Sequence, residues 1–414
     1  MRSDEADALG ALAADGIGGA VARAQELHRA IAGRVFGGLG PSAAPVRAAH
    51  DAIAGAVYSG VRVGGGVGSR LAGQAVAATR PDDGPSVTDH PRALLAVGAL
   101  NGILGDRLVA RGSALALPMR ARLAGQDIGL GAVDLADAYP DATGRVVVLL
   151  HGLCETDASW SLGTAQPDGL PPLPTYAERL RDDLGLTPVV LRYNTGRRIS
   201  DNGRDLDELL DTLIANWPCE VRELVLIGHS MGGLVIRSAC HRAHGSGRAW
   251  RGLVTHVVML GTPHLGAPLE QTVNQATRLM RRVPEALPVA AVLNVRSAGI
   301  RDLRFGAITE EDWNGHEPDH FDDPCGDVPL LEDVRHCTIS ATLAQRHDGP
   351  LGRLLGDLLV YHSSATGAGR RRRIAFTMED TVHVGGLSHF ALLNHPRVYA
   401  QLRDWLAAVP PVPA

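Results

Sequence analysis

The sequence contains no lysine: all 40 of its basic residues are arginine, and 45 acidic residues bring the formal net charge to −5. Nucleic-acid binding calls for a strongly basic face, and this near balance of charge gives none. The one basic run, Gly369 to Arg373, is typical of a solvated loop. We therefore expect no nucleic-acid partner.

Cysteine is scarce, and the five cysteines are scattered and show no C-x-x-C spacing. This usage is typical of reduced, mostly buried thiols in an intracellular protein. The sequence alone leaves open a bridge between Cys325 and Cys337. The other three cysteines are Cys154, Cys219 and Cys240.

Long apolar runs are also missing. The longest candidate, "LLAVGALNGILG" (residues 94–105), is shorter than the roughly 18 residues that a membrane span needs. The first ten residues, "MRSDEADALG", are acidic and lack the apolar core of a signal peptide. We expect a cytoplasmic protein.

The chain has two parts of different texture. Residues 1–112 are rich in alanine and glycine, and residues 7–36 and 46–80 carry apolar side chains at helical spacing. This pattern predicts a helical N-terminal region. Because its apolar faces must be buried somewhere, we expect it to pack on the remainder, residues 113–414, or to join copies of the chain into a homo-oligomer.

Residues 113–414 alternate short apolar segments with amphipathic ones. In residues 202–217 six apolar side chains fall on one helix face. The alternation predicts an α/β domain with a mostly parallel sheet covered on both faces. Strands are expected at 114–123, 145–150, 187–193, 223–228, 253–260 and 336–343.

The alternation fails over residues 266–333. This segment combines an expected helix, "LEQTVNQATRLMRRV", with a loop rich in proline and acidic residues. A structureless loop of this length is improbable in a compact domain. We therefore predict a cap or lid inserted over the carboxyl end of the sheet. Its apolar stretch "ALPVAAVLNV" (286–295) fits an acyl pocket and core packing equally well.

Residues Gly228 to Gly232, "GHSMG", fit the pattern G-x-S-x-G between an expected strand and a helix from Met231. A sharp turn there puts Ser230 in a strained backbone region, and the flanking glycines avoid a clash. The helix start turns free N–H groups and a positive dipole end toward the serine hydroxyl. Ser230 is therefore a candidate nucleophile.

A serine nucleophile needs a base and an acid that orients the base. His389 lies in a glycine-rich loop before an expected helix and is the preferred base over His383 and His395. The loop after the last strand offers Asp357, beside an apolar run that would bury it, and Asp348 in a turn-like Asp-Gly. We prefer Asp357. Less favoured acids are Glu379 and Asp380.

The backbone N–H groups of Met231 and Leu153 are candidate oxyanion donors, because one follows the nucleophile and the other follows the "HG" at the end of an earlier strand. We expect substrate-binding positions beside them. These are His151, Gly152, His229 and His264.

Five motifs together resemble α/β-hydrolase lipases and esterases, and most of all the bacterial relatives of GPI inositol-deacylase-like and triacylglycerol lipases. They are "VVVLLHGL", "LIGHSMGGLV", "LGTPHLGAPLE", "LGDLLV" and "GLSHFALLNHPRVY". The resemblance covers about residues 113 to 414. It implies a catalytic triad of Ser230, Asp357 and His389, with an oxyanion hole at Leu153 and Met231.

The expected function is hydrolysis of carboxylic esters by a serine hydrolase, with no metal or organic cofactor. The substrate would be a small-molecule or lipid ester, so peripheral contact with a membrane is also expected. Acyl transfer by the same residues is one alternative. A non-catalytic protein that binds lipids or partners through the N-terminal helices is another.

Overall fold

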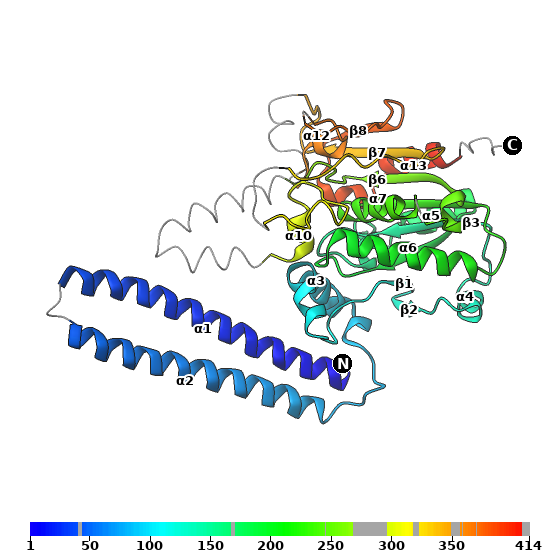
Figure 1. Ribbon diagram of the computed structural model, residues 1–414. Coiled ribbons are helices and arrows are strands. Elements are labelled where there is room, and N and C mark those ends of the chain that lie inside the picture. The colour runs from blue at the N-terminus through cyan, green and yellow to red at the C-terminus, as the bar shows by residue number, and fades with distance from the viewer. Residues whose placement is uncertain are drawn as a thin grey trace. The chain divides into compact units, whose positions relative to one another are not determined.

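A computed structural model describes residues 1–39, 44–166, 170–244, 246–267, 296–317, 323–348, 357, 359–369 and 371–407 (Figure 1). The described residues fall into two compact units. The first contains Met1–Ala93 and Leu108–Ala116. The second contains Leu94–Arg107, Leu117–Glu270 and Ser297–Ala414.

Two long helices, α1 (Ser3–Leu39) and α2 (Ala44–Ala77), form an antiparallel hairpin in the first unit (Figure 1). Glycines let their backbones touch. A Cβ added to Gly10 would lie 2.6 Å from the Cα of Gly73, and one added to Gly65 would lie 2.8 Å from Ile17. The glycine content that weakens each helix by itself is therefore used for close packing.

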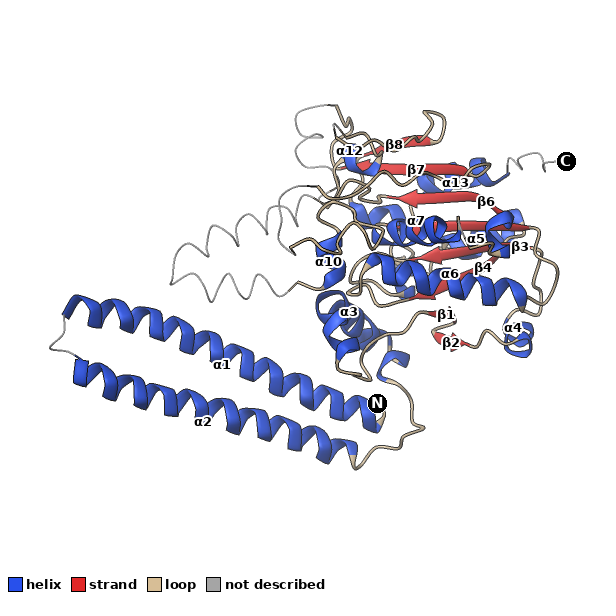
Figure 2. Cartoon of the chain, viewed as in Figure 1, coloured by secondary structure: helices blue, strands red, loops and turns tan. Residues whose placement is uncertain are grey.

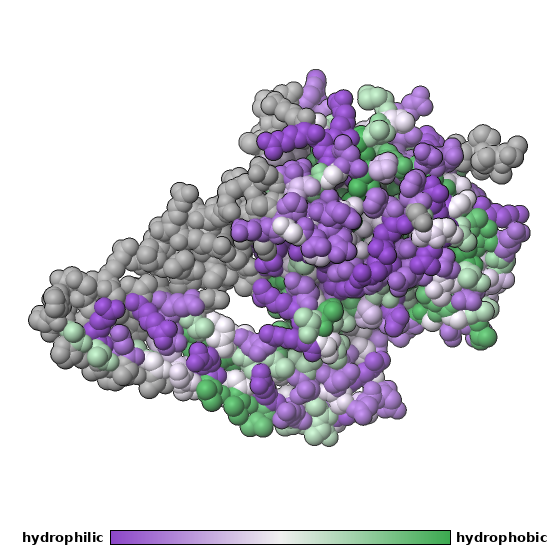
Figure 3. Space-filling view, in the orientation of Figure 1, coloured by the Kyte–Doolittle hydropathy of each residue, from purple (hydrophilic) through white to green (hydrophobic). Residues whose placement is uncertain are grey.

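The outer face of α2 is apolar and exposed. Val63, Val67 and Leu71 follow one another at four-residue spacing and are 52–61% exposed. Figure 3 shows hydrophobic residues gathered on this helix. The predicted contacts of the N-terminal helices with a membrane or a second copy stay predictions.

Helix α3 (Pro91–Ala110) departs from the predicted boundary at residue 112, because Leu94–Arg107 group with the second unit. Two of its glycines rest on one loop of that unit. A Cβ on Gly98 would lie 3.2 Å from the carbonyl oxygen of Glu155, and one on Gly102 would lie 3.0 Å from the Cα of Cys154.

The same helix also corrects the estimate of apolar length. Arg92–Ala110 is long and apolar enough to cross a membrane by length and composition alone, with 39% of it buried. Its glycine face is buried against the loop that contains Cys154 and Glu155.

The second unit is built on an eight-stranded sheet, drawn in red in Figure 2, with the order β2-β1-β4-β3-β5-β6-β7-β8. Strands β3 to β8 run parallel, and β1 pairs antiparallel with β2 and β4. The predicted mostly parallel sheet is confirmed. Its strands are β1 (Arg120–Leu123), β2 (Gln126–Ile128), β3 (Arg145–Leu150), β4 (Thr187–Arg192), β5 (Glu223–His229), β6 (Val254–Leu260), β7 (Arg335–Thr342) and β8 (Thr381–Gly385).

Both faces of the sheet are covered by helices. In β3 the side chains of Val146, Val148 and Leu150 join one core cluster, and those of Val147 and Leu149 join the other. The first cluster includes α6 (Ile199–Ala215) and α7 (Met231–Ala243), and the second includes α5 (Tyr176–Leu184) and α13 (Pro396–Ala407). Shorter helices are α4 (Ala132–Ala138), α10 (Ala298–Asp302), α12 (His362–Ala365), and the 3₁₀ turns Val87–Asp89, Asp157–Ser161, Ala249–Leu253 and His389–Leu393.

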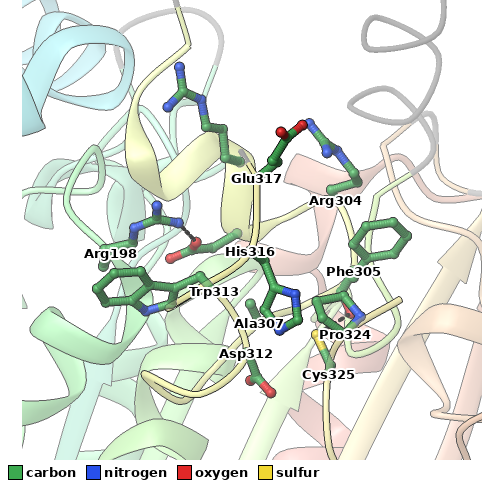
Figure 4. Close-up of a pocket in the computed structure, with 12 residues that line it drawn as sticks. Arg198, Arg304, Phe305, Ala307, Asp312, Trp313, His316, Glu317, Pro324 and Cys325 are labelled. Atoms are coloured by element: carbon green, nitrogen blue, oxygen red, sulfur yellow. Dashed lines mark hydrogen bonds and ion pairs between the residues drawn. The ribbon is translucent and has the colours of Figure 1, made fainter. Parts of the chain in front are cut away.

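The predicted cap at 266–333 is described only in part, because 268–295, which contain "ALPVAAVLNV", and 318–322 lie outside the described residues. In the described part Asp302 forms an ion pair with Arg198, whose guanidinium lies 4.4 Å from the Trp313 ring (Figure 4). Burial raises the pKa of Asp302 to about 6, against the lowering by Arg198. The cavity beside them has a volume of about 30 Å³, room for a water molecule.

All five cysteines are free thiols, so Cys325 and Cys337 are not bridged. Cys337 is buried in β7, and the thiol of Cys325 contacts the carbonyl oxygen of Phe305 at 3.8 Å. Burial raises the pKa of both thiols, which keeps them protonated and unreactive at neutral pH.

Three histidine rings cluster where β7 and β8 end. The ring of His347 lies 4.0 Å from that of His362 and 4.8 Å from that of His383, centroid to centroid. Ser340 and Thr342 of β7 hydrogen-bond His362 and His383. Burial first, and then the neighbouring histidines, lower the pKa of His362 to about 4 and also lower that of His383.

This cluster predicts a loss of stability in acid. A histidine unfolded has a pKa of about 6.5, so the unfolded chain binds more protons than the folded one as pH falls from about 6.5 toward 4. The thermal midpoint should therefore drop between pH 7.5 and pH 5. In His362→Asn, which keeps a polar partner for Ser340, the drop should be smaller. Parallel pH dependences of the two proteins would contradict this role.

Candidate active site

Ser230 occupies the turn between β5 and α7, with φ 52° and ψ −121°. A non-glycine residue with positive φ is strained and persists only where its surroundings fix it. Here the N–H of Ser230 donates to the carbonyl oxygen of Leu260 at the end of β6, over 2.8 Å. The side chain is partly exposed, whereas its neighbours His229 and Met231 are fully buried. The turn therefore presents one hydroxyl at the carboxyl edge of the sheet.

The glycines around Ser230 are required by close backbone approach. A Cβ on Gly228 would overlap the backbone of Gly233, and one on Gly232 would lie 2.5 Å from the carbonyl oxygen of Leu150 and 2.7 Å from that of His151. Side chains cannot enter such gaps without moving the strand ends. The predicted reason for the G-x-S-x-G spacing agrees with this geometry.

His389 and Asp357 form a buried pair. The Nδ1 of His389 lies 2.7 Å from the Oδ2 of Asp357, and the two side chains are 3% and 1% exposed. The other carboxylate oxygen of Asp357 accepts hydrogen bonds from the N–H groups of Leu359 and Val360. The N–H of His389 donates to the carbonyl oxygen of Asp357. Both oxygens of the acid are thus occupied, and its orientation toward the imidazole is fixed.

The less favoured bases and acids lie elsewhere. His383 belongs to the histidine cluster, and the Nδ1 of His395 accepts from the N–H of Arg397 at the start of α13. Asp348 is exposed and pairs with Arg346. Asp380 pairs with Arg335, 2.6 Å apart, and the adjacent Glu379 is exposed.

Residues next to Ser230 or bonded to its backbone lie close to His389. The His389 ring lies 4.8 Å from the ring of His229, the residue before Ser230. A Cβ on Gly261, the residue after the Leu260 that binds Ser230, would lie 3.1 Å from the His389 ring. Glycine is favoured at position 261 for two reasons: its φ is 60°, and a side chain there would meet the His389 ring.

The hydrogen bonds of His389 within the described residues run to Asp357 and His229, and none runs to Ser230. Catalytic hydrogen bonds are often long in structures without substrate and tighten on binding.

The expected oxyanion donors lie beside the nucleophile. A Cβ on Gly152 would lie 2.9 Å from the Cβ of Ser230, so the loop with Leu153 packs directly against the serine. Met231 is the first residue of α7, where a helix leaves its N–H groups without an intrahelical acceptor. Among the described residues, neither the N–H of Leu153 nor that of Met231 has a hydrogen-bond acceptor.

The three histidines expected to bind substrate are fully buried and face the protein. His151 stacks on Tyr193 with ring centroids 4.5 Å apart, and its Nδ1 lies 3.0 Å from the carbonyl oxygen of Gly152. His264 packs on Phe376, and burial lowers its pKa well below the usual value. All three histidines are therefore buried, and of the four expected positions Gly152 packs against the Ser230 side chain while His229 directly precedes Ser230 in the chain.

Sequence reasoning missed Glu155, which the structure places at the centre of the site. Its carboxylate accepts from the N–H of Gly152 at 2.6 Å and lies 3.1 Å from the Nδ1 of His229. An acid directly after "HGLC", in a turn that must be buried beneath the nucleophile, was the signal available. No group of three histidine, cysteine or acidic side chains within the described ranges is arranged to hold a metal ion.

Residues 193–317 match the family model described as "PGAP1-like alpha/beta domain". The match includes β5, the turn at Ser230 and α7. In the structure, the candidate nucleophile Ser230 directly follows β5, a central strand of the mostly parallel sheet. The fold is that of the α/β hydrolases. This agrees with the predicted resemblance to the lipases and esterases of that fold.

Several solved structures of lipases and esterases resemble the chain distantly. Lipase BlEst2 from Bacillus licheniformis, in its mature form, is 16% identical, and the match covers 63% of this chain and 91% of that one, with a TM-score of 0.41. Phospholipase PlaB from Legionella pneumophila is 14% identical, and the match covers 65% of this chain and 60% of that one, with a TM-score of 0.40. The metagenomic carboxyl esterase MGS0156 is 16% identical, and the match covers 78% of this chain and 96% of that one, with a TM-score of 0.37. No curated protein sequence matches the chain.

The packing at the turn predicts that Gly232→Ala destabilises the α/β-hydrolase unit by about 1–3 kcal/mol, because the new methyl group meets the carbonyl oxygens that end β3. Gly252→Ala is the matched control, since its Cβ would meet nothing within 4 Å. Chemical denaturation measures both. Equal stability of the two variants would show that the turn can open without strain.

Proposed function

We propose that the protein is a serine hydrolase that cleaves carboxylic esters, with Ser230 as nucleophile, His389 as base and Asp357 as the orienting acid. The observation that carries the proposal is the buried 2.7 Å pair of Asp357 and His389 beside a serine held at φ 52°. A serine hydroxyl, a carboxylate and an imidazole in this order along the chain are the parts of an α/β-hydrolase triad.

In the first half of the reaction, His389 removes the proton of Ser230 as Oγ attacks the acyl carbon. Asp357 accepts the Nδ1–H of His389, which leaves Nε2 as the free base and stabilises the imidazolium that forms. The carboxylate stays oriented because Leu359 and Val360 hold its second oxygen. The imidazolium then gives its proton to the departing alcohol, and water repeats the sequence on the acyl-enzyme.

Negative charge develops on the acyl oxygen during each half-reaction. The N–H groups of Leu153 and Met231 are placed to receive it, because both lie next to Ser230 and lack other acceptors among the described residues. The N-terminus of α7 adds a favourable dipole at the same point. Such donors are worth about 10²–10³ in kcat each.

The proposed substrates are lipid or small-molecule esters. The names of the similar solved structures, a lipase, a phospholipase and a carboxyl esterase, fit this class. No residue of the chain is assigned to a cofactor. Hydrolysis predicts that free acid and alcohol are the products even when a second alcohol is added, whereas a new ester would indicate acyl transfer.

Ser230→Ala should lower hydrolysis of p-nitrophenyl esters by roughly 10⁴-fold or more and abolish labelling by a fluorophosphonate probe, because the acyl-enzyme cannot form. The thermal midpoint should stay within a few degrees of wild type. Ester chain lengths from acetate to palmitate would define the preference. Retained turnover in the variant would rule out Ser230 as nucleophile.

Asp357→Asn should reduce kcat by on the order of 10²–10⁴-fold, because an amide donor facing Nδ1 forces the proton to Nε2, where the base is needed. Asp348→Asn, at the exposed alternative acid, should leave kcat unchanged. Steady-state rates of both variants decide between the two aspartates.

A further inference from the structure

A buried ion pair underlies the proposed site and takes no part in the proton transfers described above. Glu155 follows β3 in the loop that starts at His151, and His229 ends β5 directly before Ser230. The His229 side chain is fully buried and that of Glu155 is 7% exposed. Burying two charges away from water is expensive, so a pair retained here calls for a reason beyond stability.

Two contacts link this pair to the parts of the proposed machinery, one from each partner. The N–H of Gly152 donates to Oε2 of Glu155 over 2.6 Å. The Nδ1 of His229 lies 3.1 Å from the same carboxylate, and its Nε2 lies 3.3 Å from the backbone carbonyl oxygen of His389. At one end these contacts reach the backbone of Gly152, in the loop with Leu153. At the other end they reach the backbone of His389, the proposed base.

The geometry also sets the charge of His229. Both of its ring nitrogens face oxygen atoms that can only accept, a carboxylate and a carbonyl, so both nitrogens must carry protons. Burial by itself would raise the pKa of Glu155, but His229 and the N–H of Gly152 lower it to about 2. Burial would lower the pKa of His229, but the charge and hydrogen bond of Glu155 outweigh burial and raise it.

The carboxylate lies close to where the oxyanion would form. An ideal Cβ at Gly152 would be 2.9 Å from the Cβ of Ser230 and 3.2 Å from the Cδ of Glu155. An unpaired negative charge there would oppose the negative charge of the tetrahedral intermediate. The imidazolium of His229 neutralises the charge of the Glu155 carboxylate. Removing His229 should therefore harm catalysis more than removing the charge of Glu155.

We propose that Glu155 and His229 are positioning residues that hold the oxyanion loop and the His389 loop in one fixed frame around Ser230. The proposal rests on the ester-hydrolase function above. Glu155 fixes the loop that presents Leu153, and His229 fixes the backbone of the base. Neither touches the reacting atoms, and neither exchanges a proton with substrate.

The experiment compares Glu155→Gln, His229→Gln and the double variant with wild type. Glu223→Gln is the matched control, because Glu223 is a buried acid that pairs with Arg145 at the opposite, amino end of β5. For each protein, kcat and KM for a p-nitrophenyl ester, the rate of fluorophosphonate labelling and the thermal midpoint are measured.

Glu155→Gln keeps an acceptor for Gly152 but removes the charge that pairs with His229. It should lower kcat by roughly tenfold to a hundredfold with KM nearly unchanged, as expected for a misplaced catalytic group. His229→Gln leaves the carboxylate unpaired and should lower kcat further. Adding Glu155→Gln to His229→Gln should then restore part of kcat, because it removes that charge. Glu223→Gln should shift the thermal midpoint and leave kcat unchanged.

The outcomes separate the two proposals. If wild type neither hydrolyses esters nor reacts with the probe, the proposed function fails, and this proposal fails with it. If wild type is active and folded Glu155→Gln and His229→Gln retain kcat within twofold, the positioning role alone is overturned. Additive losses in the double variant would also overturn it. If His229→Gln alone does not fold, the comparison of Glu155→Gln with the double variant still decides.

Discussion

The strained backbone of Ser230 is the constraint on which the rest of the site depends. A side chain at φ 52° is held there because the N–H of Ser230 binds the end of β6 and because glycines let α7 start against the end of β3. Parallel strands make this possible, since β3, β5 and β6 all end at one edge. The loops after these strands supply the proposed oxyanion loop, Ser230 and Gly261, which packs against His389.

The proposed acid and base come from farther along the chain, and burial fixes their orientation. Asp357 and His389 are almost fully buried, and hydrogen bonds from the backbone of residues 359 and 360 occupy the oxygen that does not face the imidazole. A pair fixed in this way loses little entropy when substrate arrives. The same principle extends to Glu155 and His229, whose charges are satisfied by each other and by backbone groups.

Local patterns made much of the sheet and the turn predictable. Strand β3 and the start of α7 fall where β-branched runs and the G-x-S-x-G spacing put them, since both depend on nearest neighbours. Asp357 was distinguishable from Asp348 through the apolar run beside it and through the turn-like Asp-Gly at Asp348. Glu155 escaped prediction because its partner lies 74 residues away, although the acid directly after "HGLC" was a local signal. The burial of His151 and His264 likewise depends on packing between distant loops.

The glycine face of α3 has a consequence for where the chain can be shortened. Gly98 and Gly102 pack against Glu155 and Cys154, so this helix supports the loop that packs against Ser230. A truncation at residue 113, where the composition changes, would strip that support away together with the hairpin. One that begins at Pro91 would remove α1 and α2 and leave the support in place.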